Sequence, residues 1–138
     1  MITGTIGTSL SGMTAFLSYF GASVLLVMLF LAVYGRVTPY KEVALISEGN
    51  LAASLSYGGA LLGFVFPLSS AISHSVSLVD MVIWGMVALI VQIMTFLVVR
   101  FSMPGIVSDI PANQVAKGCF LGIVSAATGL INAACMTY

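Results

Sequence analysis

Residues 50–73, NLAASLSYGGALLGFVFPLSSAIS, form an uncharged stretch that is long enough to cross a lipid bilayer. About 20 apolar residues span the hydrocarbon core as a helix. The stretch nevertheless contains five serines, three glycines and one proline. A hydroxyl in hydrocarbon needs a hydrogen-bond partner, and small residues allow two helix backbones to approach closely. The stretch therefore predicts a membrane helix that lies against protein or along a polar path.

The composition of the whole chain supports a membrane setting. Of 138 residues, 60% are hydrophobic and 6% are charged, whereas soluble domains carry roughly 25% charged residues. The net charge is zero and no basic run is present, so nucleic acid is not an expected partner and membrane lipid is. No Lys or Arg precedes the first apolar segment, so we interpret that segment as retained and not as a signal peptide.

Three further apolar segments are long enough to cross a membrane, at residues 13–34, 81–99 and 114–136. The expected fold is an all-α membrane protein with four transmembrane helices, built as two tandem parallel two-helix repeats. Its expected divisions are a loosely ordered lead-in at 1–12, a first repeat at 13–73, an external loop at 74–80 and a second repeat at 81–138.

The loops contain recognisable helix signals. In the first loop, Thr38 is a candidate N-cap, Pro39 fits a first helical position and Gly49 fits a helix stop, which predicts a short helix or turn at the membrane surface. In the second loop, Ser77 or Asp80 can cap the third span.

The four basic residues predict the orientation. Arg36 and Lys41 flank the first loop, and Arg100 and Lys117 flank the third. The positive-inside rule therefore places loops one and three in the cytoplasm and both termini outside.

The two halves resemble each other at an offset of 63 residues. The matched pairs are Asn50 with Asn113, Gly59 with Gly122, Gly63 with Ala126, and Ser69 with Asn132. Two-span units preserve orientation, so the halves should be related by an axis along the membrane normal. Spans two and four are then expected to face one another, or equivalent partners, while spans one and three meet more lipid.

Small residues recur at helical spacing in spans two and four. The candidates for close helix packing, within one chain or between copies in a homo-oligomer, are Gly59, Gly63, Pro67, Gly118, Gly122 and Ala126.

Polar residues inside the spans are candidates for function. Ser69, Ser70 and Asn132 occupy matching depths, where they form either a polar ring or pocket, or interhelical hydrogen bonds that fix the packing. Gln92 either joins helices or lines a pore. Asn50 and Asn113 begin their spans at the predicted cytoplasmic face and are expected to be helix N-caps.

Catalytic chemistry is not expected. His74 and Asp80 lie near serines, but no nucleophile motif accompanies them. No metal-ligand spacing or phosphate-binding loop is present, so neither metal nor cofactor is expected. Cys119 and Cys135 would be ~24 Å apart in one helix, and we interpret them as packing residues. No ionisable residue lies deep in a span, which argues against proton-coupled transport.

Several short motifs occur together: Thr38–Pro39, Asn50–Leu55 (NLAASL), Leu61–Gly63, Pro67–Ala71 (PLSSA), Trp84–Gly85, Gln92, Pro104 and Asn132–Thr137 (NAACMT). In this combination the chain resembles the DUF350 (UPF0719) family, especially its YjfL-type bacterial inner-membrane members. The resemblance covers nearly the whole chain and implies a tandem two-helix repeat. It implies no activity, because the function of the family is unknown; genes for such proteins often lie near those for membrane-stress proteins and ATP-grasp enzymes.

Two functional hypotheses follow. The first is a homo-oligomer, not an enzyme, that offers a narrow path for an ion or small polar solute. The second is a non-conducting scaffold that recruits a peripheral, membrane-stress type partner through the cytoplasmic loops, which hold seven of the eight charged residues.

Overall fold

The computed structural model describes residues 1–136 and consists of helices joined by short connections. Their bounds are α1 (Ile2–Val37), α2 (Glu42–Ser47), α3 (Leu51–His74), α4 (Leu78–Ser102), α5 (Ile106–Asp109) and α6 (Val115–Cys135). The four long helices are apolar enough to cross a membrane, so the predicted all-α membrane fold with four spans is confirmed. Thr137 and Tyr138, which end the second repeat and the NAACMT motif, lie outside the described residues.

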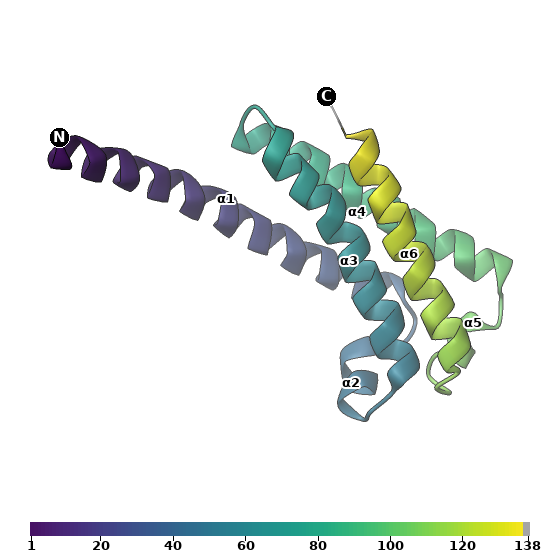
Figure 1. Ribbon diagram of the computed structural model, residues 1–138. Helices are drawn as coiled ribbons and strands as arrows, with labels where there is room; N and C mark the ends of the chain where they lie inside the picture. Colours follow the sequence, from purple (N-terminus) through teal and green to yellow (C-terminus); the bar gives the residue numbers. More distant parts are fainter. Residues whose placement is uncertain (137–138) are drawn as a thin grey trace.

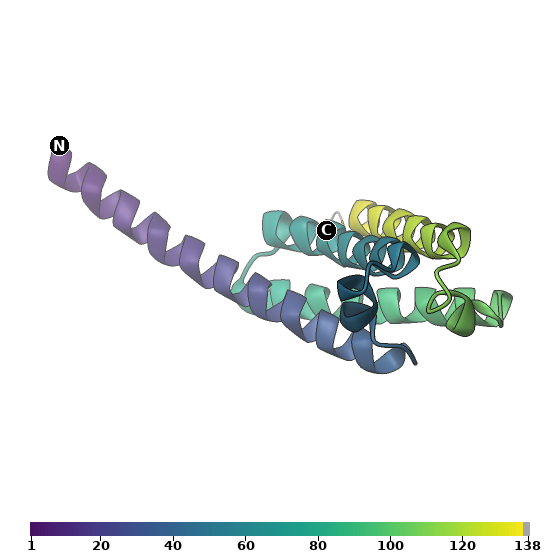
Figure 2. The same cartoon turned by 90° about the horizontal axis from the view of Figure 1, so that it is seen from below.

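The helices form two layers (Figures 1 and 2). α3 and α6 lie side by side and run in the same direction, and α4 lies across both on one side. α1 packs against α3 and α4 through its C-terminal half, while its N-terminal half diverges from the bundle. The short helices α2 and α5 lie where α3 and α6 begin, and we call this end of the molecule the basal end.

Spans two and four face one another as predicted, since α3 and α6 share the most extensive interface in the bundle. α1 is the least buried of the four spans, also as predicted. The expectation that span three would be less buried than spans two and four holds against α3 and is wrong against α6, because α4 is less buried than α3 but no less buried than α6. The reason is that α4 packs against three helices, α1, α3 and α6. The duplication itself stays a prediction.

α1 begins at Ile2, so the expectation of a loosely ordered lead-in over residues 1–12 is wrong. The hydroxyls of Thr5, Thr8 and Thr14 donate to the carbonyl oxygens four residues earlier, at 3.1, 2.9 and 3.2 Å. These bonds satisfy the polar side chains inside the helix, so that a Gly- and Thr-rich segment remains helical. With 36 residues, α1 is about 54 Å long and exceeds the ~30 Å hydrocarbon core.

Thr38 ends α1 instead of starting the next helix, so its predicted role as an N-cap is wrong. Its backbone N–H still bonds to Tyr34 O at 3.0 Å, because α1 continues further than the apolar pattern indicated. α2 begins after Lys41 and is a short helix, as predicted. Gly49 ends it with a φ of 87°, and the N–H groups of Gly49 and Asn50 both bond back into α2 at 2.9 Å, which is a Schellman ending.

Ser77 caps α4, as the sequence suggested. Its hydroxyl accepts the N–H of Asp80 at 3.1 Å, and the Asp80 carboxylate accepts the N–H of Val76 at 3.1 Å. The two bonds satisfy backbone donors at the start of the helix.

A cluster of buried aromatic rings holds α1 on the bundle. Phe30 of α1 stacks on Phe64 of α3 with ring centroids 4.6 Å apart. Tyr34, one turn later, meets Phe96 of α4 edge-on at 5.7 Å. The four rings are almost fully buried and form a continuous layer between the basal end and the middle of the bundle.

Candidate functional site

The interface between α3 and α6 is closed by glycines. A Cβ at Gly59 would overlap the backbone of Gly122, and a Cβ at Gly129 would overlap that of Gly63. A Cβ at Gly118 would lie 2.6 Å from the Cα of Ala52, which is closer than real Cβ contacts. The two backbones therefore touch, as small residues permit. The space between α3 and α6 leaves no room for a path.

The two remaining packing candidates, Pro67 and Ala126, lie on α3 and α6 outside the glycine contacts. Pro67 is buried within α3, and Ala126 is half-buried on α6. A buried proline inside a helix leaves one backbone carbonyl without its usual donor.

Asn50 and Asn113 both serve the start of α3. Asn50 caps its own helix, since its Oδ1 accepts the N–H of Ala53 at 2.8 Å. Asn113 does not cap α6, which corrects the sequence-based expectation: its Oδ1 accepts the N–H of Ala52 in α3 at 3.1 Å. The backbone of Asn113 is left-handed, with a φ of 61°, and this conformation turns the residue away from its own helix. α6 instead begins after Gln114 with no side-chain cap.

Gln92 is fully buried where α3, α4 and α6 meet. Its Nε2 donates to Ser125 O at 3.1 Å. The amide fits beside Gly63, where a Cβ would lie 2.6 Å from Nε2 and 2.7 Å from Oε1. Gln92 thus joins α4 to α6 through its Nε2, whereas its Oε1 takes no part in this contact.

Two polar atoms at this meeting point have no partner within residues 1–136: Gln92 Oε1 and Ser125 Oγ. A serine inside a helix commonly bonds to the carbonyl four residues earlier, and Ser125 does not. An unpartnered buried polar group costs about 1–3 kcal/mol. Groups of this kind are where proteins bind ordered water or a ligand.

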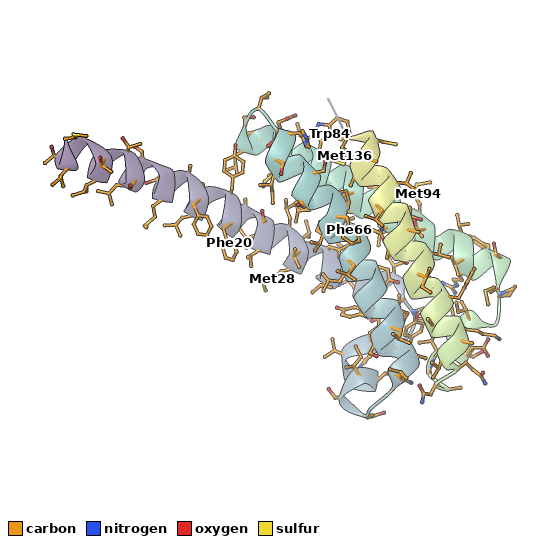
Figure 3. All side chains as sticks on the ribbon, viewed as in Figure 1. Phe20, Met28, Phe66, Trp84, Met94 and Met136 are labelled. Atoms are coloured by element: carbon orange, nitrogen blue, oxygen red, sulfur yellow. The ribbon has the colours of Figure 1, made fainter. Side chains whose placement is uncertain are left out.

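The predicted ring of Ser69, Ser70 and Asn132 does not form within one chain. Ser69 is exposed and lines an apolar groove of about 690 Å³ between α1 and α3. Ser70 faces the other way and donates to Ala133 O of α6 at 3.2 Å. Adjacent residues on a helix point about 100° apart, which is why neighbouring serines reach different surfaces. Figure 3 shows Phe20 of α1 to the side of the α3–α6 pair, and this residue lines the groove with Ser69.

Asn132 differs from the two serines because it keeps an unused donor inside the bundle. Its side chain is half-buried, and its Nδ2 is buried without a partner among the described residues. It follows Ser125 by seven residues, which is two helical turns or about 10 Å along the same face of α6.

A buried carboxyl group, Glu42, lies at the basal end, and the sequence analysis missed it. Only 3% of Glu42 is exposed, and its carboxylate accepts a hydrogen bond from Thr38 Oγ1. The ion pair found among residues 1–136 joins Lys117 to Asp109 and leaves Glu42 without a cation. Burial raises the pKa of Glu42 above its ordinary value, against a smaller lowering by the hydrogen bond from Thr38. An isolated buried carboxyl of this kind favours its neutral form.

Tyrosines surround this carboxyl group. Tyr40 is buried beside it, and both burial and the neighbouring Glu42 raise the pKa of Tyr40 well above its ordinary value. Tyr34 is 1% exposed, and its hydroxyl has no partner within the described chain. The burial of Glu42 could not be predicted from the sequence, because the residue lies outside every apolar span and becomes buried only when α2 folds against α3. The four-residue spacing of Tyr34, Thr38 and Glu42 is no helical signal, because α1 ends at Val37 and Glu42 begins a different helix.

These polar groups follow one another along the bundle. Glu42 and Tyr34 lie at the basal end, and the Tyr34 ring contacts Phe96, which is one helical turn from Gln92 on α4. Gln92 and Ser125 lie near the middles of their helices. Asn132 lies two turns further along α6. The unpartnered atoms thus extend from the basal end to beyond the middle of the spans.

Comparison with known proteins places the chain in a family. Residues 8–136 match the model of the Domain of Unknown Function DUF350. The UPF0719 inner membrane protein YjfL of Escherichia coli K12 is 43% identical over 129 residues, covering 94% of this chain and 98% of the relative. The UPF0719 transmembrane protein YshE of Bacillus subtilis is 30% identical over 119 residues, covering 85% and 89%.

No solved structure is significantly similar to the chain. The family match and the four apolar helices agree with one another. The chain therefore belongs to the DUF350 family and is an inner-membrane protein with four apolar helices.

Proposed function

We propose that this protein provides a narrow path through the membrane for an ion or a small polar solute, without catalysing a reaction. The observation that supports the proposal most is the pair of buried, unpartnered atoms Gln92 Oε1 and Ser125 Oγ at the middle of the spans. A polar group in the membrane interior is costly unless something hydrates or binds it. Such groups in other membrane proteins mark the routes of ions and solutes.

The path is proposed to run on the side of the α3–α6 pair that faces α4. Glycine contacts close the space between α3 and α6 themselves. Gln92 approaches this pair from α4, beside Gly63 and Ser125. From there the polar groups continue towards Tyr34 in one direction and Asn132 in the other.

The basal end is proposed to face the cytoplasm, with both termini outside. The residues that bound the connections there include Arg36, Lys41, Arg100 and Lys117, which are all of the Lys and Arg residues in the chain. Positive charge concentrates on the cytoplasmic side of inner-membrane proteins.

The protein is further proposed to act as a homo-oligomer within the lipid. Four helices are too few to enclose a wide pore, and the first half of α1 is exposed along its length. A second copy that covers the groove at Ser69 would bury this apolar surface.

A scaffold for a peripheral membrane-stress type protein is the second candidate. It is favoured by the position of seven of the eight charged residues at the basal end, where Lys41 and Glu48 are exposed. Charge-reversing variants at these two positions would abolish partner binding under this alternative and leave flux unchanged under the first.

Silver ions, added on the side of the membrane opposite the basal end, test whether the Gln92–Ser125 region is accessible from water. Cys119 and Cys135 are free thiols and are first replaced by alanine. Ser125→Cys then places a thiol in the proposed path, and Thr128→Cys is the control on the same helix. Thr128 lines an apolar hollow between α4 and α6 with Val91 and Val98, and its hydroxyl bonds within its own helix at 2.8 Å.

We expect Ag⁺ to react rapidly with the thiol of Ser125→Cys, which would lie in the water-accessible path. The thiol of Thr128→Cys should react slowly, because it lies in an apolar hollow and Ag⁺ does not enter hydrocarbon. Equal protection of both thiols, in protein that remains folded and reconstituted, would contradict a water-accessible path.

A further inference from the structure

Glu42 is enclosed by several elements, and in the described part of the chain none of them supplies a cation paired with its carboxylate. α1 contributes Tyr34 and Thr38, the connection to α2 contributes Tyr40, and α3 contributes Tyr57. From α4, Arg100 lies within electrostatic reach of Tyr40, and it forms no ion pair with Glu42 among the described residues. A buried carboxylate without a cation tends to bind a proton instead.

The layer between Glu42 and Gln92 is too densely packed for a hydrated ion. Phe30, Phe64 and Phe96 are fully buried there, with Phe30 and Phe64 stacked at 4.6 Å. The Tyr34 hydroxyl lies among these groups, within electrostatic reach of Glu42, and is unpartnered within residues 1–136. A hydroxyl both donates and accepts a hydrogen bond, which is the property that passes a proton through a space too narrow for an ion with its water shell.

From this juxtaposition we propose that the solute carried by the path is the proton and that the Glu42 carboxyl group is its binding site at the basal end. This proposal rests on the path proposed above. The sequence-based argument against proton-coupled transport considered only ionisable residues deep in the spans, whereas Glu42 lies outside them, at the basal end.

The proposed transfer is balanced at each step. A hydronium ion in the basal water gives its proton to the Glu42 carboxylate and becomes water. The neutral carboxyl then gives this proton to a water molecule, which passes one of its own protons to the Tyr34 hydroxyl oxygen, while the original Tyr34 hydroxyl proton moves to a second water towards Gln92. Tyr34 is neutral before and after the step, and Glu42 returns to its carboxylate form.

The test uses the full-length protein in liposomes, with an internal pH dye and a potential set by potassium and valinomycin. Glu42→Gln keeps the shape of the side chain and its capacity to accept a hydrogen bond from Thr38, but it exchanges no proton. Proton flux should fall about 100-fold, the lower end of what a positioned proton-transfer group contributes. Glu48→Gln, which removes an exposed carboxylate at the C-terminal end of α2, should leave the flux unchanged.

The possible outcomes distinguish a failure of the proton assignment from a failure of the proposed path. Flux of sodium or potassium but not of protons in the wild type would overturn the proton assignment and leave the path intact. Wild-type proton flux that Glu42→Gln retains would overturn the role of Glu42. The absence of any flux would overturn the path itself.

A second readout does not depend on flux. Difference infrared spectroscopy detects the C=O band of a protonated carboxyl group, and Glu42→Gln assigns it. The band should titrate with a midpoint above the ordinary 4.5 of glutamate and be absent from Glu42→Gln. A midpoint at or below 4.5 would contradict proton binding at this site, even if the variant altered the fold.

Discussion

Asn50 and Asn113, which lie 63 positions apart, cap the same helix. Asn50 Oδ1 accepts the N–H of Ala53 at 2.8 Å, and Asn113 Oδ1 accepts that of Ala52 at 3.1 Å. Asn50 Nδ2 in turn donates to Ile110 O and Pro111 O, at 3.0 and 3.2 Å. These bonds join the connection before α6 to the start of α3, so the two halves of the chain are locked together at the basal end.

Asn113→Gly should lower the free energy of unfolding by about 1 kcal/mol, the usual net contribution of one hydrogen bond. Glycine accepts the φ of 61°, so this variant isolates the loss of the cap. Asn113→Ala should cost about 1 kcal/mol more, because alanine is strained in the left-handed region. Denaturant titration in detergent measures both variants, and a neutral Asn113→Gly would show that the bond to Ala52 contributes nothing.

Gly59→Ala should destabilise the protein by about 1–3 kcal/mol, the cost typical of overpacking. The new methyl group would overlap the backbone of Gly122, so α3 and α6 would have to separate. Gly58→Ala is the matched control, since a Cβ there meets nothing within 4 Å, and it should stabilise the helix by up to about 1 kcal/mol. Thermal unfolding of the two variants gives the comparison, and equal stabilities would refute close contact of α3 and α6.

Stability should fall as the pH rises from 4.5 towards the folded-state pKa of Glu42. The folded protein raises this pKa by burial, so over that interval the folded state holds more protons than the unfolded state. The stabilising contribution is complete below the unfolded pKa and is lost as the pH passes through the folded one. Unfolding curves across this interval, compared with those of Glu42→Gln, measure the effect. The variant should lack this slope, and a wild type whose slope matches that of the variant would contradict the neutral buried carboxyl.

Asn132→Leu should reduce flux, whereas Ser69→Leu should not. Asn132 has a buried donor with no partner within residues 1–136, while Ser69 is exposed in the groove between α1 and α3. Flux assays at equal incorporation distinguish the two positions. A loss of flux in Ser69→Leu alone would move the path to the groove between α1 and α3.

The apolar pattern was sufficient to predict the four spans, and the similarity of the two halves led to the prediction that spans two and four, now α3 and α6, face one another. Glycine spacing in span four also indicated the face that packs, because a 3.6-residue period shows in sequence. Two features were not predictable in this way. Asn113 is the residue expected before a helix, and only its left-handed backbone directs it to α3. Glu42 belongs to a loop by composition, and its burial depends on the folding of α2 against the bundle.

The candidate site was only partly predictable for the same reason. Gln92 stood out as a lone amide in an apolar span, and its two possible roles both have support in its geometry: Nε2 joins helices, and Oε1 is left unpartnered. Ser69 and Ser70 were grouped by depth, but depth does not specify direction around a helix. Their actual partners are set by the position of α1 and α6.

The buried atoms Gln92 Oε1 and Ser125 Oγ are proposed to line a conducting path. Proton, sodium and potassium flux in liposomes containing the purified wild type, measured beside Gln92→Leu, tests this claim directly. Thr95→Val is the control, because Thr95 lies one turn away on α4 and its hydroxyl is already bonded to Val91 O at 2.8 Å. If the path exists, the wild type and Thr95→Val should both show flux, and Gln92→Leu should show none at equal incorporation into the liposomes. Flux in none of them, or equal flux in all three, would contradict it.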